Sequence, residues 1–363
     1  MYSRVRLNEF MVCLFTFFMN VEIFEEGTLF LQDVAKQSRV GVGGVLRVSH
    51  APSFLTRLHT FFIRLCYEEI YELIEKKIVA DDQLEEPTIG KFGITGTPGI
   101  GKSLFLMYFI SRWLWDKGKH GRTIVLETAM DEFYIITIST RPECVCASSN
   151  NSLRKYLREN ERKADFLLVD GKVCNKPPFE MLGCRMLWAS SPKFGWYKEI
   201  MKDSSVRLYM PIWNMSEMEK CWKQILPDKI SEEEFKKRVE EVGMIPRFVF
   251  RTDQSRYNQD WSDVEKSASS EIKPVVNISD IERMKPTVHR VFHMDEGGVE
   301  GGEKYLSSKL VVASPEVVRL ILAFWRRDVV AHHLHSFISD QRTPFFVFET
   351  AFHLFRTSHA ARF

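Results

Sequence analysis

The sequence predicts an α/β fold, a parallel sheet with helices on both faces, joined to a small α+β C-terminal region. Residues 96–103 (GTPGIGKS) fit the phosphate-loop pattern G-x-x-x-x-G-K-[ST]. A strand-like run precedes this octapeptide, and an apolar, helix-like run, 104–115 (LFLMYFISRWLW), follows it. Further strand-like runs alternate with helical or loop stretches, which is typical of a parallel sheet. The expected fold is therefore that of a P-loop NTPase.

The predicted strands are short apolar runs, and the predicted helices are longer periodic ones. The strands cover 92–95, 123–127, 133–139, 166–170, 185–190 and 206–211. Residues 104–115 are too many for a strand and predict a core helix. Residues 54–78 have apolar residues at helical spacing, which predicts one or two amphipathic helices. Residues 231–242 begin with a serine followed by glutamates, which predicts an N-capped surface helix.

Length and composition fit two domains and a flanking segment. The chain has 363 residues, enough to bury a large core. A polar stretch rich in Ser and Asp, 253–274, marks a boundary, and beyond it we expect strands at 289–294 and 309–313 and a helix at 315–337. The predicted parts are an N-terminal flanking segment at 1–85, a P-loop NTPase domain at 86–252 and an α+β region at 253–363.

The residue types of the loop suit phosphate binding. Its glycines allow backbone angles and a close approach that a β-carbon would block, so that successive N–H groups can point at a phosphate near the positive end of the next helix. Lys102 should reach the β- and γ-phosphates, and the Ser103 hydroxyl should bind Mg²⁺. The alternative is a Gly/Pro turn before a buried helix. The expected nucleotide-binding residues of the loop are Gly96, Thr97, Pro98, Gly99, Ile100, Gly101, Lys102 and Ser103.

A phosphate loop needs an acidic partner for the metal, and Asp170 supplies one at the end of FLLVD. The order of these motifs predicts the branch of P-loop NTPases that has a strand inserted beside the phosphate-loop strand. We expect Ser103 and Asp170 to be the metal ligands; the alternative is a turn aspartate after an ordinary buried strand. In that branch a glutamate often follows the aspartate and activates the attacking water. Gly171 stands there instead, so nucleotide binding is better supported than hydrolysis.

Three further residues complete the predicted site. Glu127 ends a neighbouring strand and is a substitute base, or else a solvent-facing carboxylate. Ser190 follows the next strand and should lie near the γ-phosphate, or else is a plain turn serine. Arg247, in the segment GMIPR, should reach the γ-phosphate from a lid, or else forms a surface salt bridge. The expected catalytic residues are Lys102, Asp170, Arg247 and Glu127.

Composition limits the classes of partner. The chain has 50 Lys+Arg against 48 Asp+Glu, which argues against direct nucleic-acid binding by a globally basic surface. No guanine-reading N-K-x-D is present, so ATP with Mg²⁺ is the expected ligand. The seven cysteines are odd in number and include no C-x-x-C pair, which predicts free thiols in a reducing compartment.

The first residues leave the cellular location open. No run reaches the roughly 18 apolar residues of a membrane span. Arg4 and Arg6 precede an apolar run at 10–19, which imitates a short signal peptide, although no small-residue cleavage site follows. The alternatives are a buried strand or helix and a misplaced start codon.

Several segments, in order, resemble the Crinkler-type proteins of oomycetes, fungi and other protists, and more distantly the trypanosome retrotransposon hot spot proteins. The resemblance covers about residues 61–363. The matched segments are FFIRLCYEEIY, GTPGIGKSLFLMYFI, GRTIVLE, FLLVDG, LWASSP, YMPIW with NMSEME following, and GMIPRFVF.

The resemblance implies a P-loop ATPase module of the AAA+/STAND kind, often joined to a restriction-endonuclease-like nuclease domain. It implies phosphate and Mg²⁺ binding by Lys102 and Ser103, metal binding by Asp170 and nucleotide sensing by Arg247. Many members are effectors that enter a host cell and often its nucleus, which implies protein partners there. RTPFFVFETAFHLF resembles the entry into the nuclease region, with Glu349 as its first acidic residue. No later D…E-x-K cluster follows, so we expect no nuclease activity in this chain.

The predicted function is ATP binding with slow or conditional hydrolysis, in which nucleotide state sets the arrangement of the two domains. The alternatives are an interaction protein that holds ATP as a structural ligand and a truncated paralogue without activity. The resemblance implies secretion and delivery to a host cell; otherwise the protein is intracellular. The segment GTLFLQDVAK (27–36) is at best a weak match to the translocation motif of the secreted oomycete members.

Overall fold

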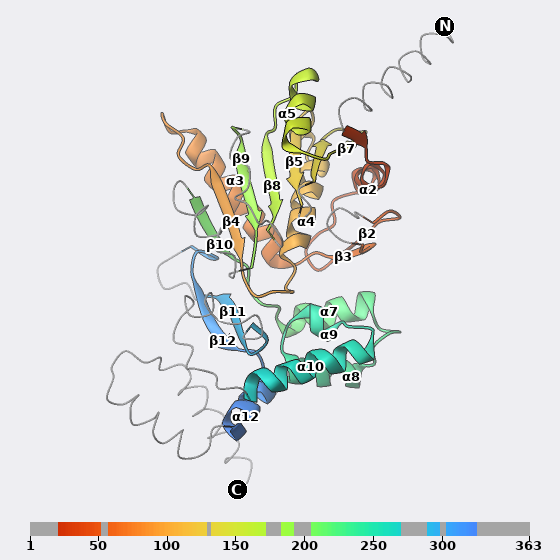
Figure 1. The fold of residues 1–363 in the computed structure, drawn as a ribbon, viewed down its shortest axis with the longest axis vertical. Coiled ribbons are helices and arrows are strands. Elements are labelled where there is room, and N and C mark those ends of the chain that lie inside the picture. Colours follow the sequence, from red (N-terminus) through yellow and green to blue (C-terminus); the bar gives the residue numbers. More distant parts are fainter. Residues whose placement is uncertain are drawn as a thin grey trace. The chain divides into compact units, whose positions relative to one another are not determined.

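The computed structural model describes residues 21–51, 57–128, 132–171, 183–191, 205–269, 289–297 and 303–324 (Figure 1). Contacts within the chain divide it into two units. The first comprises 1–96, 101–211 and 298–307, and the second comprises 97–100, 212–297 and 308–363. The predicted domain limits at 85 and 252 stay a prediction.

An eight-stranded sheet organises the first unit (Figure 1). Five adjacent strands, which reach one edge of the sheet, are parallel, and the other three extend the opposite side with antiparallel pairing. In spatial order the strands are β1 (Val21–Ile23), β7 (Glu143–Ala147), β6 (Phe133–Thr137), β5 (Thr123–Glu127), β8 (Phe166–Asp170), β9 (Arg185–Ala189), β4 (Lys91–Thr95) and β10 (Ser205–Tyr209). The predicted α/β class and a mostly parallel sheet are confirmed.

The antiparallel strand β6 departs from the parallel sheet that the sequence predicts. Only residues 128–132 separate it from β5, and a parallel crossover needs a dozen or more residues. The two strands therefore pair as a hairpin, with Leu126 opposite Tyr134. Strand β7 was not predicted, although it buries Cys144, Val145 and Ala147.

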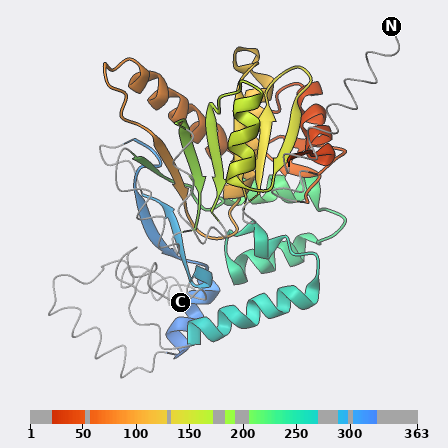
Figure 2. The same ribbon diagram turned by 45° about the horizontal axis from the view of Figure 1, so that its top comes forward.

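Helices cover both faces of the sheet, as predicted. On one face, the Phe166 ring of β8 lies 5.0 Å, centroid to centroid, from Phe109 of α4 (Lys102–Trp115). On the other face, Leu167 belongs to a buried cluster with Leu153 and Leu157 of α5 (Asn150–Glu159). Figure 2 shows α5, in yellow-green, in front of the strands. Because side chains alternate along a strand, β8 buries residues on both of its faces.

Strand β9 lies between β4 and β8, so a strand is inserted beside the one that precedes the predicted phosphate loop. This is the order that the motif positions predict. Carboxyl ends of parallel strands meet at one edge of a sheet, and ligands of open α/β folds bind there. The loop after β4 and the carboxylate at the end of β8 therefore lie at the same edge.

The N-terminal part of the first unit is more varied than the sequence predicts. It contains α2 (Glu25–Lys36), the hairpin strands β2 (Val45–Arg47) and β3 (Thr60–Phe62), and α3 (Leu65–Asp82). The prediction of helix over 54–78 is therefore wrong at its start, where Phe61 of β3 pairs with Leu46 of β2. Phe61 and Phe62 are both buried, so tertiary packing of this aromatic run overrides its helical spacing. A short 3₁₀ helix, η1 (Lys117–Lys119), follows α4.

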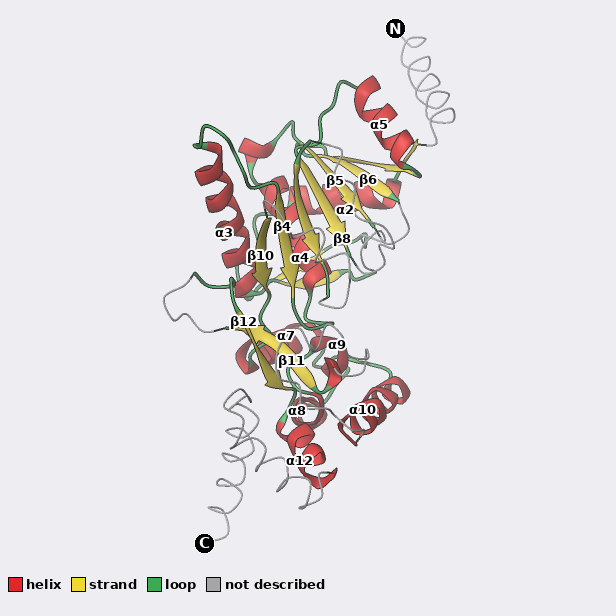
Figure 3. Cartoon of the chain, turned by 60° about the vertical axis from the view of Figure 1, so that its left-hand side comes forward, coloured by secondary structure: helices red, strands yellow, loops and turns green. Residues whose placement is uncertain are grey.

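The second unit combines helices with a two-stranded hairpin (Figure 3). Helix α8 begins after Ser231, whose hydroxyl accepts a hydrogen bond from the Glu234 N–H, as its N-cap pattern predicts. The predicted helix at 315–337 is described only to residue 324. The elements are α7 (Met215–Ile225), α8 (Glu232–Val242), α9 (Pro246–Val249), α10 (Gln254–Ser269), β11 (Phe292–Glu296), β12 (Ser308–Val312) and α12 (Pro315–Phe324). Among the described residues, no helix is long and apolar enough to cross a membrane.

Candidate functional site

The predicted phosphate loop connects β4 to α4. Its glycines adopt backbone angles that side-chain-bearing residues rarely adopt, with φ of 150° at Gly96, 92° at Gly99 and 109° at Gly101. Helix α4 begins at Lys102, directly after the last glycine. Strand, glycine turn and helix are therefore arranged as the sequence predicts.

The end of the loop is fixed within the first unit. The Tyr67 hydroxyl of α3 donates a 2.8 Å hydrogen bond to the Gly101 carbonyl. A β-carbon at position 101 would lie only 2.2 Å from the Tyr67 oxygen, so this position requires glycine for space as well as for φ. The Lys102 ammonium donates to the Gly96 carbonyl at 2.7 Å, and the residue is 9% exposed. A buried ammonium group therefore lies against the loop, where a phosphate would be neutralised.

The structure brings Ser103 and Asp170 together. The Ser103 hydroxyl, in the first turn of α4, donates to an Asp170 carboxylate oxygen at 3.2 Å, and Asp170 is the last residue of β8. Mg²⁺ prefers oxygen ligands and keeps waters or phosphate oxygens in its remaining positions. Among the described residues no group of three or more His, Cys, Asp or Glu forms a metal site. The hydroxyl and carboxylate thus suit a cation shared with a phosphate.

Glu127 is not brought to this pair. It ends β5, is 6% exposed, and pairs with Val169 in the sheet. Neighbouring paired residues point to the same face, and Val169 and Val125 both belong to the cluster beneath α5. Asp170 points to the opposite face, where α4 lies. Glu127 therefore lies level with Val169, one residue before Asp170, and on the opposite face of the sheet from Asp170.

Ser190 follows β9 and is 2% exposed. Its hydroxyl donates to the Ser191 carbonyl at 2.9 Å, and its N–H donates to the Ile94 carbonyl. The hydroxyl contact is that of a turn serine, the alternative that the sequence leaves open. A role at the γ-phosphate stays a prediction.

Trp188 explains why position 171 holds glycine. A β-carbon at Gly171 would lie 1.8 Å from the indole nitrogen of Trp188 on β9, and Trp188 is 1% exposed. No side chain fits at 171 unless the indole moves. The sequence offers one signal for this contact, since a glycine at a strand end often marks a close approach by another group.

The middle of the loop, 97–100, belongs to the second unit. The Trp213 indole N–H donates to the Ile100 carbonyl at 2.9 Å, and Thr97 is bonded to β11. A β-carbon at Gly99 would lie 2.8 Å from the Cβ of Arg247. The exposed Arg247, second residue of α9, therefore packs against Gly99, while Pro98 is half-buried.

A network of charged and aromatic side chains holds α4 against α3. Arg112 and Tyr108 of α4 both donate to the buried Glu68 carboxylate of α3, and Arg39 donates to it as well. Burial raises the pKa of Glu68, but the hydrogen bonds from Tyr108, Arg39 and Arg112 outweigh it and leave this pKa below its ordinary value. Burial, together with the Glu68 contact, raises the pKa of Tyr108 to about 12. Glu68 therefore stays ionised and ties the two helices together.

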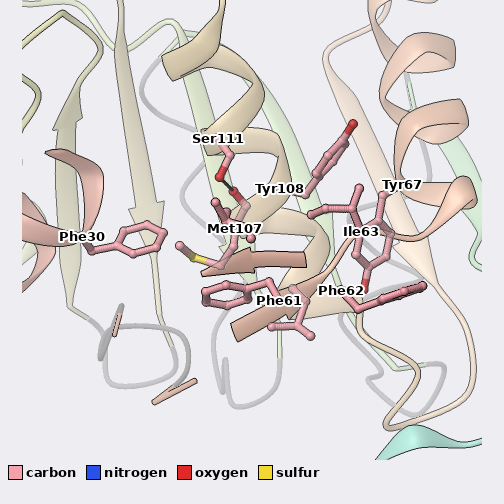
Figure 4. A pocket seen from close by; sticks show the side chains of 10 residues that line it. Phe30, Phe61, Phe62, Ile63, Tyr67, Met107, Tyr108 and Ser111 are labelled. Atoms are coloured by element: carbon pink, nitrogen blue, oxygen red, sulfur yellow. Dashed lines mark hydrogen bonds between the residues drawn. The ribbon is translucent and has the colours of Figure 1, made fainter. Parts of the chain in front are cut away.

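A small apolar hollow lies beside this network (Figure 4). Tyr67 and Tyr108 line one side of it and Phe30 lies across from them, with Met107 between. The hollow holds about 10 Å³, space for on the order of one water molecule. Ligand pockets measure about 300–1,000 Å³. The hollow is therefore a feature of core packing rather than a ligand site.

Comparison with known proteins identifies relatives but no domain family, since no family model matches the chain. The chain is 26% identical to Crinkler effector protein 15 of Phytophthora infestans over 284 residues, 76% of this chain and 42% of that protein. It is 29% identical to Crinkler effector protein 16 of the same organism over 171 residues, 45% of this chain and 24% of that protein. The chain thus spans less than half the length of these relatives. The predicted resemblance to Crinkler-type proteins is confirmed, and the more distant one to retrotransposon hot spot proteins stays a prediction.

Proposed function

Because the chain is homologous to Crinkler effector proteins, we propose that it is an effector module that binds ATP with Mg²⁺ and hydrolyses it slowly. The observation that carries the proposal is the 3.2 Å contact between Ser103 and Asp170 at the end of a glycine loop. A hydroxyl from the loop helix and a carboxylate from a separate strand converge where a phosphate-bound Mg²⁺ would be held. Nucleotide state would then set the arrangement of the chain's domains.

The residues suit electrostatic stabilisation of a triphosphate. Ser103 and Asp170 would hold Mg²⁺, which would supply positive charge to the phosphates, and the loop N–H groups and the start of helix α4 would add to that charge. Lys102, now hydrogen-bonded to the Gly96 carbonyl, would exchange that neutral acceptor for a negatively charged phosphate oxygen. Arg247 would supply a further positive charge to the γ-phosphoryl group. Catalysis by such groups is mostly positioning and charge neutralisation.

Lys102→Ala tests the proposal. Calorimetric titration with ATP and Mg²⁺ should show binding by the wild type and a loss of affinity of about ten- to a hundredfold in the variant, because a hydrogen bond to a charged group is removed. Lys163→Ala, which removes an exposed lysine of the first unit, should bind as the wild type does. Phosphate release should follow the same pattern. Equal affinities for the wild type and Lys102→Ala would sink the proposal.

A second candidate is a protein that holds ATP without turning it over. The packing of Trp188 against Gly171 favours it, since the position after the metal-binding aspartate is filled by an indole and has no room for a water-activating carboxylate. Glu127 lies on the opposite face from Asp170 and is poorly placed to replace it. ATP binding with no phosphate release, also in the presence of a protein partner, would support this second function over the first.

Secretion and delivery to a host cell or its nucleus belong to the same proposal. The homology to effectors is the support for them, and the apolar run at 10–19, which imitates a short signal peptide, lies outside the described residues. Glu349 and the nuclease-like segment around it also lie outside them. Tracking a tagged full-length chain during infection would test delivery, and a tag that stays inside the producing cell would contradict it.

A further inference from the structure

Thr97 makes an unusual pair of hydrogen bonds with one residue of β11. Its hydroxyl accepts from the Met294 N–H at 2.7 Å and donates to the Met294 carbonyl at 3.1 Å. Both residues belong to the second unit, and Thr97 is 1% exposed. A hydroxyl is both donor and acceptor, so this one side chain pairs with both backbone groups of Met294.

Met294 needs such a partner because of its place in the hairpin. Strand β11 pairs with β12, where Met294 lies opposite Leu310, and these two strands make up the sheet among the described residues. In an antiparallel pair, every second residue directs its N–H and carbonyl away from the neighbouring strand. Met294 is such a residue and is 2% exposed, so its backbone groups would be costly to leave unpaired. Thr97 satisfies both, as an added strand would.

The same unit holds two more residues of the loop. The Ile100 carbonyl accepts from the indole of Trp213, which is 4% exposed. At Gly99, where φ is 92°, the site of a β-carbon is only 2.8 Å from Arg247 Cβ and 3.1 Å from Ile245 Cγ2. Glycine-rich backbone has little conformational preference of its own and loses much entropy when it is ordered. These contacts therefore hold the loop backbone in one conformation, which its glycines alone would not do.

We propose that Thr97 is a positioning residue for the triphosphate: its hydroxyl anchors the middle of the phosphate loop to Met294 and pre-arranges the loop N–H groups for phosphate. The inference rests on the proposed function, since it assumes that the loop binds ATP. Pre-arranged donors avoid the ordering cost at the moment of binding, which raises affinity. The methyl group of Thr97 has no part in this effect, because the bonds are made by the hydroxyl.

The anchor also has a consequence for β11. Binding free energies are reciprocal, so a nucleotide that favours the anchored loop must favour the two Met294 bonds to the same extent. Exchange of the Met294 amide hydrogen should therefore slow when ATP and Mg²⁺ are added to the wild type. This readout needs no mutation and reports on the Met294 N–H that Thr97 accepts.

Two substitutions at Thr97 separate the hydroxyl from the side-chain shape. Thr97→Val keeps the shape and removes the hydroxyl, whereas Thr97→Ser keeps the hydroxyl and removes the methyl group. Titration with ATP and Mg²⁺ should show an affinity about ten- to a hundredfold lower for Thr97→Val, because two hydrogen bonds to buried groups are lost. Thr97→Ser should remain within about threefold of the wild type, since a small methyl loss changes affinity little.

The outcomes distinguish this inference from the proposed function. A wild type that does not bind ATP contradicts both. A wild type that binds ATP while folded Thr97→Val binds it equally well contradicts the inference alone, as does a Thr97→Ser variant that loses as much affinity as Thr97→Val. If Thr97→Val does not fold, the Met294 amide decides: slower exchange with ATP supports the anchor, and unchanged exchange overturns it.

Discussion

His293 makes the stability of the second unit depend on pH. It lies on β11, is 0% exposed, and neither ring nitrogen has a hydrogen-bond partner among the described residues. Its ring packs near Gly243, where a β-carbon would lie 3.3 Å from the imidazole Cε1. Burial lowers the pKa of His293 from 6.5 to about 3, because it removes the charged imidazolium from bulk solvent. The folded state therefore keeps this side chain neutral.

The sign and size of the effect follow from the two pKa values. The pKa of His293 is lower in the folded state than in the unfolded state. The folded state therefore has its full stability above pH 6.5 and loses stability as the pH falls toward 3. At pH 5 the His293 imidazole is protonated in the unfolded chain and neutral in the folded chain. At about 1.4 kcal/mol per pH unit below 6.5, the folded state loses about 2 kcal/mol. Below pH 3 the loss levels off.

Amide exchange of β11 at pH 7 and pH 5, corrected for intrinsic rates, measures this free energy in the unit concerned. His293→Leu is the control, because it fills the site with an apolar side chain that does not titrate. Carboxylates such as Glu68 titrate in both proteins, and their contributions cancel in the difference. The wild type should lose about 2 kcal/mol more than His293→Leu between the two pH values. Equal losses would refute the reasoning.

Further substitutions test the loop, the proposed metal ligands and the core. Gly101→Ala should lower ATP affinity at least about tenfold in a titration, because φ is 109° and the new β-carbon meets Tyr67. Adding Tyr67→Phe should not restore the affinity, because the backbone strain of about 1–3 kcal/mol remains. Ser103→Ala and Asp170→Asn should each weaken ATP binding in Mg²⁺ but leave binding in EDTA unchanged; equal losses in both media would speak against metal ligation. Phe166→Ala should cost about 3–5 kcal/mol in urea unfolding, because its ring is 2% exposed, and a cost below about 1 kcal/mol would contradict the packing described.

Local pattern and spacing were enough to predict the centre of the first unit. The run before the loop is apolar and short, the run after it is apolar and long, and the glycines between them require positive φ. Each of these is a property of neighbouring residues. The meeting of Ser103 with Asp170 was also predictable, because the ends of parallel strands share one edge of a sheet.

The features that sequence reasoning missed depend on residues far apart in the chain. Strand β3 forms because Phe61 pairs with Leu46, which no local period reveals. Helix α10 lies in a polar stretch and is held by distant partners, such as the ion pair from Arg290 to Asp260. The contact of Trp188 with Gly171 crosses from β9 to the end of β8. In each case tertiary contacts decide the conformation, and local propensity is only a weak guide to it.

The central claim is that the loop, Lys102, Ser103 and Asp170 together hold ATP with Mg²⁺. Thermal unfolding with ATP, GTP and Mg²⁺ tests it most directly, since a ligand bound only by the folded state stabilises it by RT ln(1 + [L]/Kd), about 2.7 kcal/mol at a hundredfold excess over Kd. ATP with Mg²⁺ should raise the unfolding temperature of the wild type and raise that of Lys102→Ala much less. An unfolding temperature that neither nucleotide changes, or that ATP raises equally in both proteins, would contradict it.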